Sequence, residues 1–232
     1  YWLKDPYFDE KTRLELESLT DPKEIEERFY MDLEFGTGGL RGILGAGTNR
    51  MNIYVVRKVT QGLADYIKEY GEEGKKRGVV IAYDSRRFSS CFAKEAALVL
   101  AANGIRAYLF KELRPTPELS YAVRHLHAIA GIVITASHNP KEYNGYKVYW
   151  EDGGQVPPKR AEEILQRIQS RHEWVIYPLK EEEALSKGLL QYIGEEVDQA
   201  YLKDVKSLAL YPDLIREKGD KLSIVYTPLH GA

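Results

Sequence analysis

A hydroxyl, an imidazole and a carboxamide stand next to one another in the sequence at Ser137, His138 and Asn139. The apolar run before them, residues 132–134, is typical of a strand buried on both faces, and the proline after them disfavours a helix. In an open α/β sheet, ligands usually bind where the carboxyl end of a strand reaches the surface. We therefore expect these three side chains in a ligand-facing loop. Lys147 follows a second turn, predicted at Asn144-Gly145, and is close enough to fold back toward Ser137.

Three roles for Ser137 compete. A serine in a turn most often caps that turn through its hydroxyl. An acyl-transfer nucleophile would stand in a Gly-x-Ser-x-Gly elbow, which the sequence around Ser137 lacks. A serine that carries a phosphoryl group needs cations and backbone N–H groups around the phosphate, and a group that transfers the proton of the attacking hydroxyl. His138, Lys147 and the arginines described below fit the third role best.

Glycine is dense in residues 35–50, which read Phe-Gly-Thr-Gly-Gly-Leu-Arg-Gly-Ile-Leu-Gly-Ala-Gly-Thr-Asn-Arg. Such a stretch lets the backbone approach a ligand and line up its N–H groups as an anion-binding nest. It is not a Walker loop, because no Gly-Lys-Ser/Thr occurs. It is not a dinucleotide fingerprint either, because Arg41 stands at the third glycine position and a helix is expected before it. A flexible loop without a ligand is the alternative that glycine alone leaves open.

The sequence Thr-Ala-Ser-His-Asn-Pro at residues 135–140, followed by Asn-Gly-Tyr-Lys at residues 144–147, resembles the phosphoserine loop of the α-D-phosphohexomutases. This family contains phosphoglucomutases, phosphomannomutases and related phosphopentomutases. Phe-Gly-Thr-x-Gly-Leu-Arg-Gly at residues 35–42 is similar to the N-terminal signature of the family, whose arginine faces the active serine. The resemblance extends over the whole chain.

The resemblance implies a role for each of these side chains. Ser137 would carry the phosphoryl group, Lys147 would do acid/base work, and Arg41 would be a cation beside the phosphate. Asp84 and Arg86 match an Asp-x-Arg that the family carries near its catalytic centre; a surface ion pair, which stabilises little, is the alternative. The implied catalytic residues are Ser137, Lys147, His138 and Arg41, and the implied phosphate- or substrate-binding residues are Thr37, Gly38, Gly39, Arg86 and Asn139.

The resemblance also implies Mg²⁺ as cofactor and glucose 1,6-bisphosphate as activator. Family members bind the metal through an Asp-Gly-Asp-x-Asp-Arg loop of domain II, and a phosphoryl oxygen on the serine, here Ser137, completes the shell. No such cluster of aspartates occurs in this chain, and Ser137 alone should hold Mg²⁺ poorly. The implied division is domain I at residues 1–217 and a truncated first strand of domain II at residues 218–232, with domains III and IV absent. The isolated chain is then expected to be inactive.

Substrate choice is the next expectation. The closely spaced glycine-rich and serine-containing blocks look most like the bacterial phosphoglucomutase and phosphopentomutase-like branch. We therefore favour an α-phosphoglucomutase, which interconverts glucose 1-phosphate and glucose 6-phosphate through a phosphoserine and a bisphosphate intermediate. Phosphomannomutase and phosphopentomutase are the enzymatic alternatives. A sugar-phosphate binding module without chemistry is the non-enzymatic one.

The composition is that of a globular chain with a sizeable core: 232 residues, 44% hydrophobic, 29% charged, with a formal charge of −2. This balance gives no reason to expect nucleic acid or an anionic membrane as partner. The single cysteine, Cys91, excludes an internal disulfide and is compatible with a reducing cytoplasm. No apolar run approaches the ~20 residues of a membrane span, and no signal-peptide pattern is present. We expect a cytoplasmic protein.

Hydrophobic periodicity predicts a three-layer α/β/α domain with a mixed, mainly parallel sheet. Strands are expected near residues 79–83, 105–110, 129–134 and 146–150, with an edge pair from the glycine-rich stretch and a last buried strand at 224–227. Helices are expected twice within residues 1–34, then at 52–70, from a cap at Ser89 or Ser90 to 103, from a cap at Thr116, at 157–171 and at 195–210. In the last of these, the apolar residues Val197, Tyr201, Leu202 and Val205 are expected to face inward. Residues 71–78 and 173–194 are predicted to lack regular structure. An apolar face left by the absent domains favours self-association of the chain.

Overall fold

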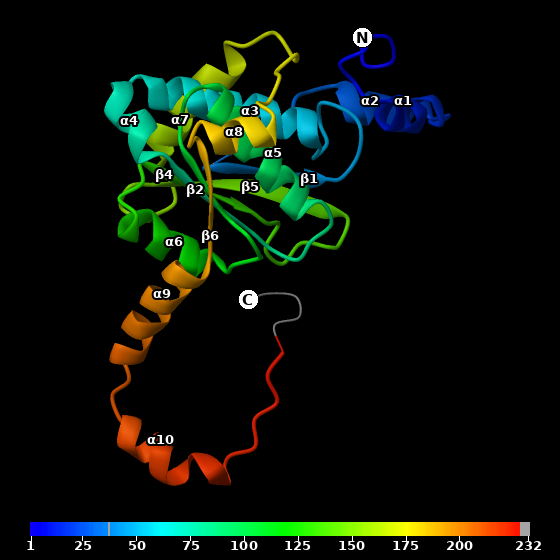
Figure 1. The fold of residues 1–232 in the computed structure, drawn as a ribbon. Helices are drawn as coiled ribbons and strands as arrows, with labels where there is room; N and C mark the ends of the chain where they lie inside the picture. The colour runs from blue at the N-terminus through cyan, green and yellow to red at the C-terminus, as the bar shows by residue number, and fades with distance from the viewer. Residues whose placement is uncertain (37, 228–232) are drawn as a thin grey trace.

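The computed structural model describes residues 1–36 and 38–227, in which a mixed sheet lies between layers of helices (Figure 1). Its strands are β1 (Gly39–Ile43), β2 (Val79–Tyr83), β3 (Ala107–Phe110), β4 (Ala130–Ile134), β5 (Tyr143–Trp150) and β6 (Leu190–Ile193). Their order in the sheet is β1-β5-β4-β2-β3-β6. β5 is antiparallel to β1 and β4, and the other neighbouring strands pair in parallel. The predicted fold class, with a strand from the glycine-rich stretch at one edge, is confirmed.

Helices cover both faces of this sheet. In the described residues they are α1 (Glu10–Glu17), α2 (Pro22–Phe29), α3 (Ile53–Lys68), α4 (Gly71–Arg77), α5 (Ser89–Ala102), α6 (Thr116–His125), α7 (Pro158–Gln169), α8 (Glu181–Ser186), α9 (Glu195–Ser207) and α10 (Pro212–Lys218). Figure 1 shows α3, α5 and α7 on one face and α6 on the other, with α9 leading away from the sheet. No helix of the described part is long and apolar enough to cross a membrane.

The central strands are buried on both faces, which explains their uninterrupted apolar sequences. In β2, Val79 and Ile81 pack into the larger core with α3 and α5, whereas Val80 and Ala82 pack with α6 on the opposite face. All four side chains are inaccessible to solvent. The sheet is therefore a rigid support for the loops that leave its carboxyl edge.

Most predicted helix starts are close to the observed ones. The helix predicted from residue 52 is α3, and Asn52 caps it by accepting a hydrogen bond from the Val55 N–H at 3.0 Å. Two cap predictions are wrong. Phe88, with a φ of 64°, precedes the first residue of α5, so Ser89 does not cap that helix. Pro115, not Thr116, is the N-cap of α6.

Two segments predicted to lack regular structure are ordered. Residues 71–77 form α4, in which Gly74 packs so closely on Tyr70 that an added Cβ would lie 2.8 Å from that side chain. Residues 173–194 contain α8 and the edge strand β6, which pairs with β3. Leu190 of β6 packs in the larger core and Ile193 on the α6 face. The charged residues around these short elements obscured them in the sequence.

The C-terminal part of the chain is more exposed than predicted. Only Val197 of α9 is buried, while Leu202 and Val205, which were expected to face inward, are each 45% exposed. The strand expected at residues 224–227 is not formed in the described part, where Val225 is 96% exposed. Residues 228–232 lie outside the described residues. In the described part, other elements cover Leu202 and Val205 only partly and leave Val225 exposed.

Candidate active site

The Ser137 loop is the tip of the hairpin that joins β4 to β5. In the antiparallel register of these strands, Val133 lies opposite Lys147. Asn144 and Gly145, which were predicted to form a turn, belong to β5 instead. Strand pairing therefore places Lys147 beside β4, near the end of the sheet from which the Ser137 loop leaves.

Ser137 has an unusual backbone conformation. Its φ is 57°, in the left-handed region that residues other than glycine seldom occupy. Its N–H donates to Oγ1 of Thr135 at 2.9 Å, and the Asn139 N–H donates to the Ala136 carbonyl at 3.1 Å. These bonds make a tight turn that leaves Ser137 exposed to solvent. Strained residues of this kind often occur at functional sites.

Arg41 reaches the same loop from β1. It lies opposite Gly145 of β5, and a side chain at Gly145 would collide with the backbone: an added Cβ would be 2.6 Å from the Thr135 carbonyl oxygen and 2.8 Å from that of Leu40. Glycine thus permits the close approach of these segments. Nη1 of Arg41 donates to Oδ1 of Asn139 at 2.7 Å. The predicted pair of Arg41 and the serine loop is therefore in direct contact.

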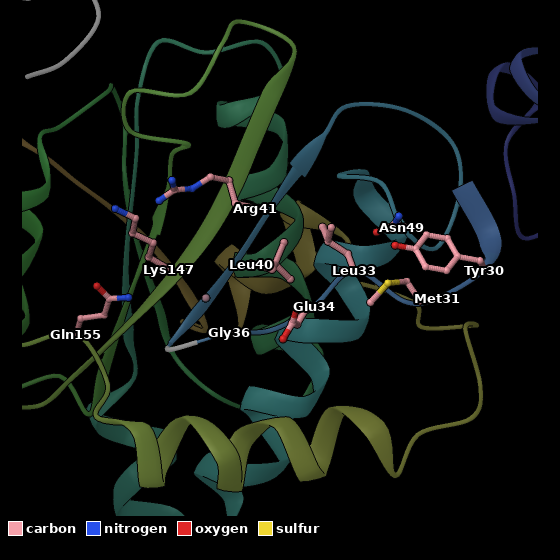
Figure 2. A pocket seen from close by; sticks show the side chains of 11 residues that line it. Tyr30, Met31, Leu33, Glu34, Gly36, Leu40, Arg41, Asn49, Lys147 and Gln155 are labelled. Carbon is pink, nitrogen blue, oxygen red and sulfur yellow. The ribbon is translucent and has the colours of Figure 1, made fainter. Parts of the chain in front are cut away.

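A cleft of about 570 Å³ opens beside these residues. Arg41 and Lys147 line one part of it, and Tyr30 and Met31 line another. Figure 2 shows the charged ends of Arg41 and Lys147 on the same side of β1. Ser137 is not among the described residues that line the cleft; it lies on the loop that Arg41 contacts.

Lys147 is half-buried, and its surroundings favour the neutral amine. Burial lowers the pKa of Lys147 below its ordinary value, and the positive charge of Arg41 lowers it further. A lysine with a lowered pKa is more readily available as a general base near neutral pH. The arrangement therefore supplies a fixed cation and a titratable amine next to each other.

Arg86 lies under the loop and binds its backbone. Nη2 donates to the carbonyl oxygens of Ser137 and Asn139, both at 2.7 Å. Nη1 donates to the carbonyl oxygens of Pro140 at 2.9 Å and Tyr143 at 3.2 Å. The side chain is only 15% exposed, so the alternative of a simple surface ion pair is wrong.

A buried polar network that the sequence did not indicate holds the base of the loop. Asp84 accepts hydrogen bonds from Oγ of Ser89 at 2.7 Å and from the Arg86 N–H at 3.0 Å. The amide nitrogen of Asn144 donates to Oγ of Ser89 at 3.0 Å and to the Arg87 carbonyl at 2.9 Å. Asn144 is completely buried. The Asn-Gly pair suggested only a turn, and the partners of Asn144 lie more than 50 residues away in the sequence, so no local signal pointed to them.

The glycine-rich stretch is explained largely by packing. An added Cβ on Gly39 would lie 2.4 Å from the Tyr146 carbonyl oxygen, and one on Gly38 would lie 2.7 Å from the Val156 side chain. The Gly38 N–H donates to the Gly36 carbonyl at 2.7 Å. Phosphate binding by Gly38 and Gly39 stays a prediction. Thr37, predicted to bind phosphate, lies outside the described residues.

His138 follows Ser137 and is exposed. No hydrogen bond or ion pair joins it to another residue of the described ranges, whereas Asn139 is held by Arg41. The structure thus brings Arg41, Asn139 and Arg86 into contact with the Ser137 loop and leaves His138 free to turn.

Comparison with known proteins identifies this arrangement. Residues 32–174 match the family described as "Phosphoglucomutase/phosphomannomutase, alpha/beta/alpha domain I". The chain belongs to this family. A phosphoglucomutase from Staphylococcus saprophyticus is 43% identical over 204 residues, covering 86% of this chain and 35% of that protein. A phosphopentomutase from Mus musculus is 37% identical over 238 residues, covering 99% of this chain and 38% of that protein.

Solved structures agree with this assignment. A crystal structure from Thermus thermophilus, assigned as a phosphomannomutase, is 28% identical and superposes with a TM-score of 0.63. The matched region covers 76% of this chain and 36% of that structure. This chain therefore spans a little over a third of the length of the relatives described here.

The magnesium that the family resemblance implies does not fit this chain alone. Within residues 1–36 and 38–227, no group of three His, Cys, Asp or Glu side chains is arranged to hold a metal ion. Asp84, a carboxylate near the loop, already accepts bonds from Ser89 and Arg86. Oxygen ligands for Mg²⁺ would have to come largely from elsewhere.

Proposed function

We propose that this chain is domain I of a longer phosphohexomutase and that Ser137 carries the phosphoryl group. The single observation that supports this most strongly is the loop itself. It is a hairpin tip with an exposed serine, whose backbone Arg86 binds and whose Asn139 is bound by Arg41. In this proposal residues 1–217 form domain I and residues 218–232 begin domain II. The length of the relatives supports further domains beyond this chain.

In the proposed reaction, one phosphoryl group passes from Ser137 to the sugar, and another then passes from the sugar to Ser137. A hydroxyl of the sugar monophosphate attacks the phosphorus on Ser137, the bond from phosphorus to Oγ breaks, and a sugar bisphosphate forms. Neutral Lys147 accepts the proton of the attacking hydroxyl and returns it to Oγ of Ser137. The bisphosphate then reorients, and Ser137 takes its other phosphoryl group by the reverse steps. The lowered pKa of Lys147 supports its role as the base.

Charge on the transferring group would be offset by fixed donors. Arg41 supplies a guanidinium that stays protonated throughout, and loop N–H groups supply dipoles that need no reorganisation. Asn139, which Arg41 holds, would orient the loop; the same role was predicted for His138, whose side chain has no partner among the described residues. Mg²⁺, if bound to the phosphoryl oxygen on Ser137, would take its protein ligands from outside this chain. Glucose 1,6-bisphosphate is the proposed activator that phosphorylates Ser137.

Glucose phosphate is the favoured substrate. The S. saprophyticus phosphoglucomutase has the higher identity of the two relatives compared above, which supports the conversion of glucose 1-phosphate to glucose 6-phosphate. Pentose phosphate is the second candidate, because the mouse phosphopentomutase aligns over 99% of this chain. Rates of the complete polypeptide with glucose, mannose, ribose and deoxyribose 1-phosphates would decide among them.

The central test is Ser137→Ala in the complete polypeptide. Incubation of the wild type with glucose 1,6-bisphosphate should add one phosphoryl group to the peptide that contains Ser137, as measured by mass spectrometry. The variant should show neither this modification nor mutase activity. Ser90→Ala, which removes an exposed hydroxyl at the start of α5, is the matched control and should retain both. Activity in the Ser137 variant would reject the proposal, and a wild type that binds but is never modified would favour a binding module.

Two further properties belong to this proposal. A free, exposed thiol at Cys91 supports a cytoplasmic location. Exposed apolar side chains at Leu210, Ile215 and Val225 support self-association of the isolated chain. Its proposed inactivity alone is supported by its covering 35% of the S. saprophyticus protein and by the lack of a metal-holding group among the described residues. Sedimentation velocity of residues 1–232 at increasing concentration would measure the association.

A further inference from the structure

Arg86 contacts the backbone of the Ser137 loop at an unusual number of points. Its two terminal nitrogens donate to the carbonyl oxygens of Ser137, Asn139, Pro140 and Tyr143, at 2.7, 2.7, 2.9 and 3.2 Å. A planar guanidinium has donors in a fixed fork, so it can bind several acceptors only when they converge in its plane. The loop must therefore be folded around this side chain.

These bonds fix the direction of the loop's peptide groups. No peptide bond in the described residues is cis, so each C=O points opposite to the N–H of the same peptide. Because the Ser137 carbonyl points toward Arg86, the His138 N–H points away from it. The Pro140 carbonyl likewise turns the Lys141 N–H away. Neither N–H donates to another residue of the described ranges.

The carboxylate of Asp84 holds Arg86 in place. Its Nε lies 3.4 Å from Oδ2 of Asp84, and its backbone N–H donates to Oδ1 of the same carboxylate. Asp84 also accepts from Ser89 at the start of α5, which ties the guanidinium to the end of β2. With its terminal nitrogens on loop carbonyls and Nε facing Asp84, Arg86 is not oriented toward a ligand.

We propose that Arg86 is a positioning residue and does not bind the phosphate of the substrate. It draws the carbonyl dipoles of the loop to one side and leaves N–H groups, foremost that of His138, on the other side beside the hydroxyl of Ser137. Carbonyl oxygens near a phosphoryl dianion would repel it, whereas N–H groups stabilise the charge that is transferred. This inference rests on the proposed phosphoserine function and replaces the phosphate-binding role predicted for Arg86 from the sequence.

The test uses the complete polypeptide and steady-state kinetics with the sugar phosphate that it turns over. Arg86→Ala should lower kcat about 100-fold, the effect of a misplaced reacting group, with KM within about twofold of the wild type. Arg86→Lys should lose nearly as much, because an ammonium cannot bind four carbonyls in one plane. Millimolar guanidinium chloride should restore part of the kcat of Arg86→Ala and none of that of Arg86→Lys. The exposed neighbour Arg87 provides the matched control, and Arg87→Ala should keep the kcat of the wild type.

The outcomes separate this inference from the function on which it rests. If the wild-type polypeptide shows neither turnover nor a modified Ser137, the proposed function itself is rejected. In an active enzyme, a raised KM with unchanged kcat in Arg86→Ala would make Arg86 a substrate ligand and overturn the inference. Wild-type kcat in Arg86→Lys would overturn it too, because charge alone would then suffice. If Arg86→Ala does not fold, Arg86→Lys still decides, with circular dichroism as the check on folding.

Discussion

Two arginines at the ends of adjacent parallel strands have different partners. Arg86 follows β2 and binds neutral carbonyl oxygens of the Ser137 loop. Arg114 follows β3, and its Nε and Nη2 donate to both carboxylate oxygens of Asp198 in α9, at 2.8 and 2.6 Å. Oε1 of Glu118 in α6 lies 3.9 Å from Nε of Arg114. The charge of Arg114 is neutralised, and it connects α9 to the strand end.

The difference is one of local charge. Around Ser137, Arg41 binds an amide and Lys147 lies near that cation, so positive charge is retained where a phosphoryl group is proposed. Around Arg114, carboxylates are in excess. Arg114 thus stabilises packing. Near Ser137, the positive charge that favours anions comes from Arg41 and Lys147, so the partners of each cation decide its role.

We expect the largest effect from a substitution of Arg41, in the positively charged surroundings of Ser137. Arg41→Gln in the complete polypeptide should lower kcat/KM by about 100- to 1000-fold, because it removes a fixed cation from the transferring phosphoryl group. The loss of a like charge should also raise the pKa of Lys147, so the rising limb of the pH–rate profile should move to higher pH. Unchanged kcat/KM would mean that Arg41 acts only on Asn139.

Arg114→Ala should affect stability and leave the chemistry intact. It leaves Asp198 and the buried Glu118 without their cation, at a cost of about 2 kcal/mol in the free energy of unfolding. Urea denaturation would measure this cost. Arg124→Ala removes an exposed arginine from α6, the helix that carries Glu118, and should change stability by less than about 0.5 kcal/mol. Equal losses in the two variants would contradict the neutralising role of Arg114.

The smallest effect is a pH dependence at Glu118. Burial raises the pKa of Glu118 from 4.5 to about 7, and the Asp198 carboxylate adds to the shift. The folded state therefore favours the protonated acid; this contribution is complete below pH 4.5 and is lost as the pH rises toward 7. Glu118→Gln should match the wild type near pH 4.5 and be more stable by roughly 1–2 kcal/mol near pH 8. Thermal melts across this range would test it, and a difference independent of pH would refute it.

The parts of the fold that were predictable from the sequence are those in which local pattern and burial agree. Residues 79–83 form a strand that is buried on both faces, and their apolar sequence predicted it. The helix α3 begins directly after Asn52, where the sequence predicted a helix. The strand Leu190–Ile193 was missed because its neighbours on both sides are charged and because pairing with β3, a distant segment, creates it. Leu202 and Val205 have helical spacing, yet spacing cannot tell whether another element covers them.

Some contacts of the candidate site were also predictable from the sequence, and others were not. Ser137, Asn139 and Arg41 were predicted as neighbours from a sequence resemblance, and the contact of Arg41 with the loop agrees with that. The partners of Arg86 could not be predicted, because carbonyl oxygens have no residue identity and converge only when the hairpin has formed. Asn144 was missed for the same reason: its burial depends on Ser89, which is far away in the sequence.

At Ser137, the left-handed backbone favours glycine, whereas the proposed chemistry needs a hydroxyl. Glycine would adopt a φ of 57° without penalty, whereas serine there costs about 1 kcal/mol or more. Under the proposed function, the hydroxyl that carries the phosphoryl group thus stands at a position where the fold alone would favour glycine. If Ser137 carries the phosphoryl group as proposed, activity and stability make opposite demands on this position, and Ser137→Gly would gain stability at the expense of turnover.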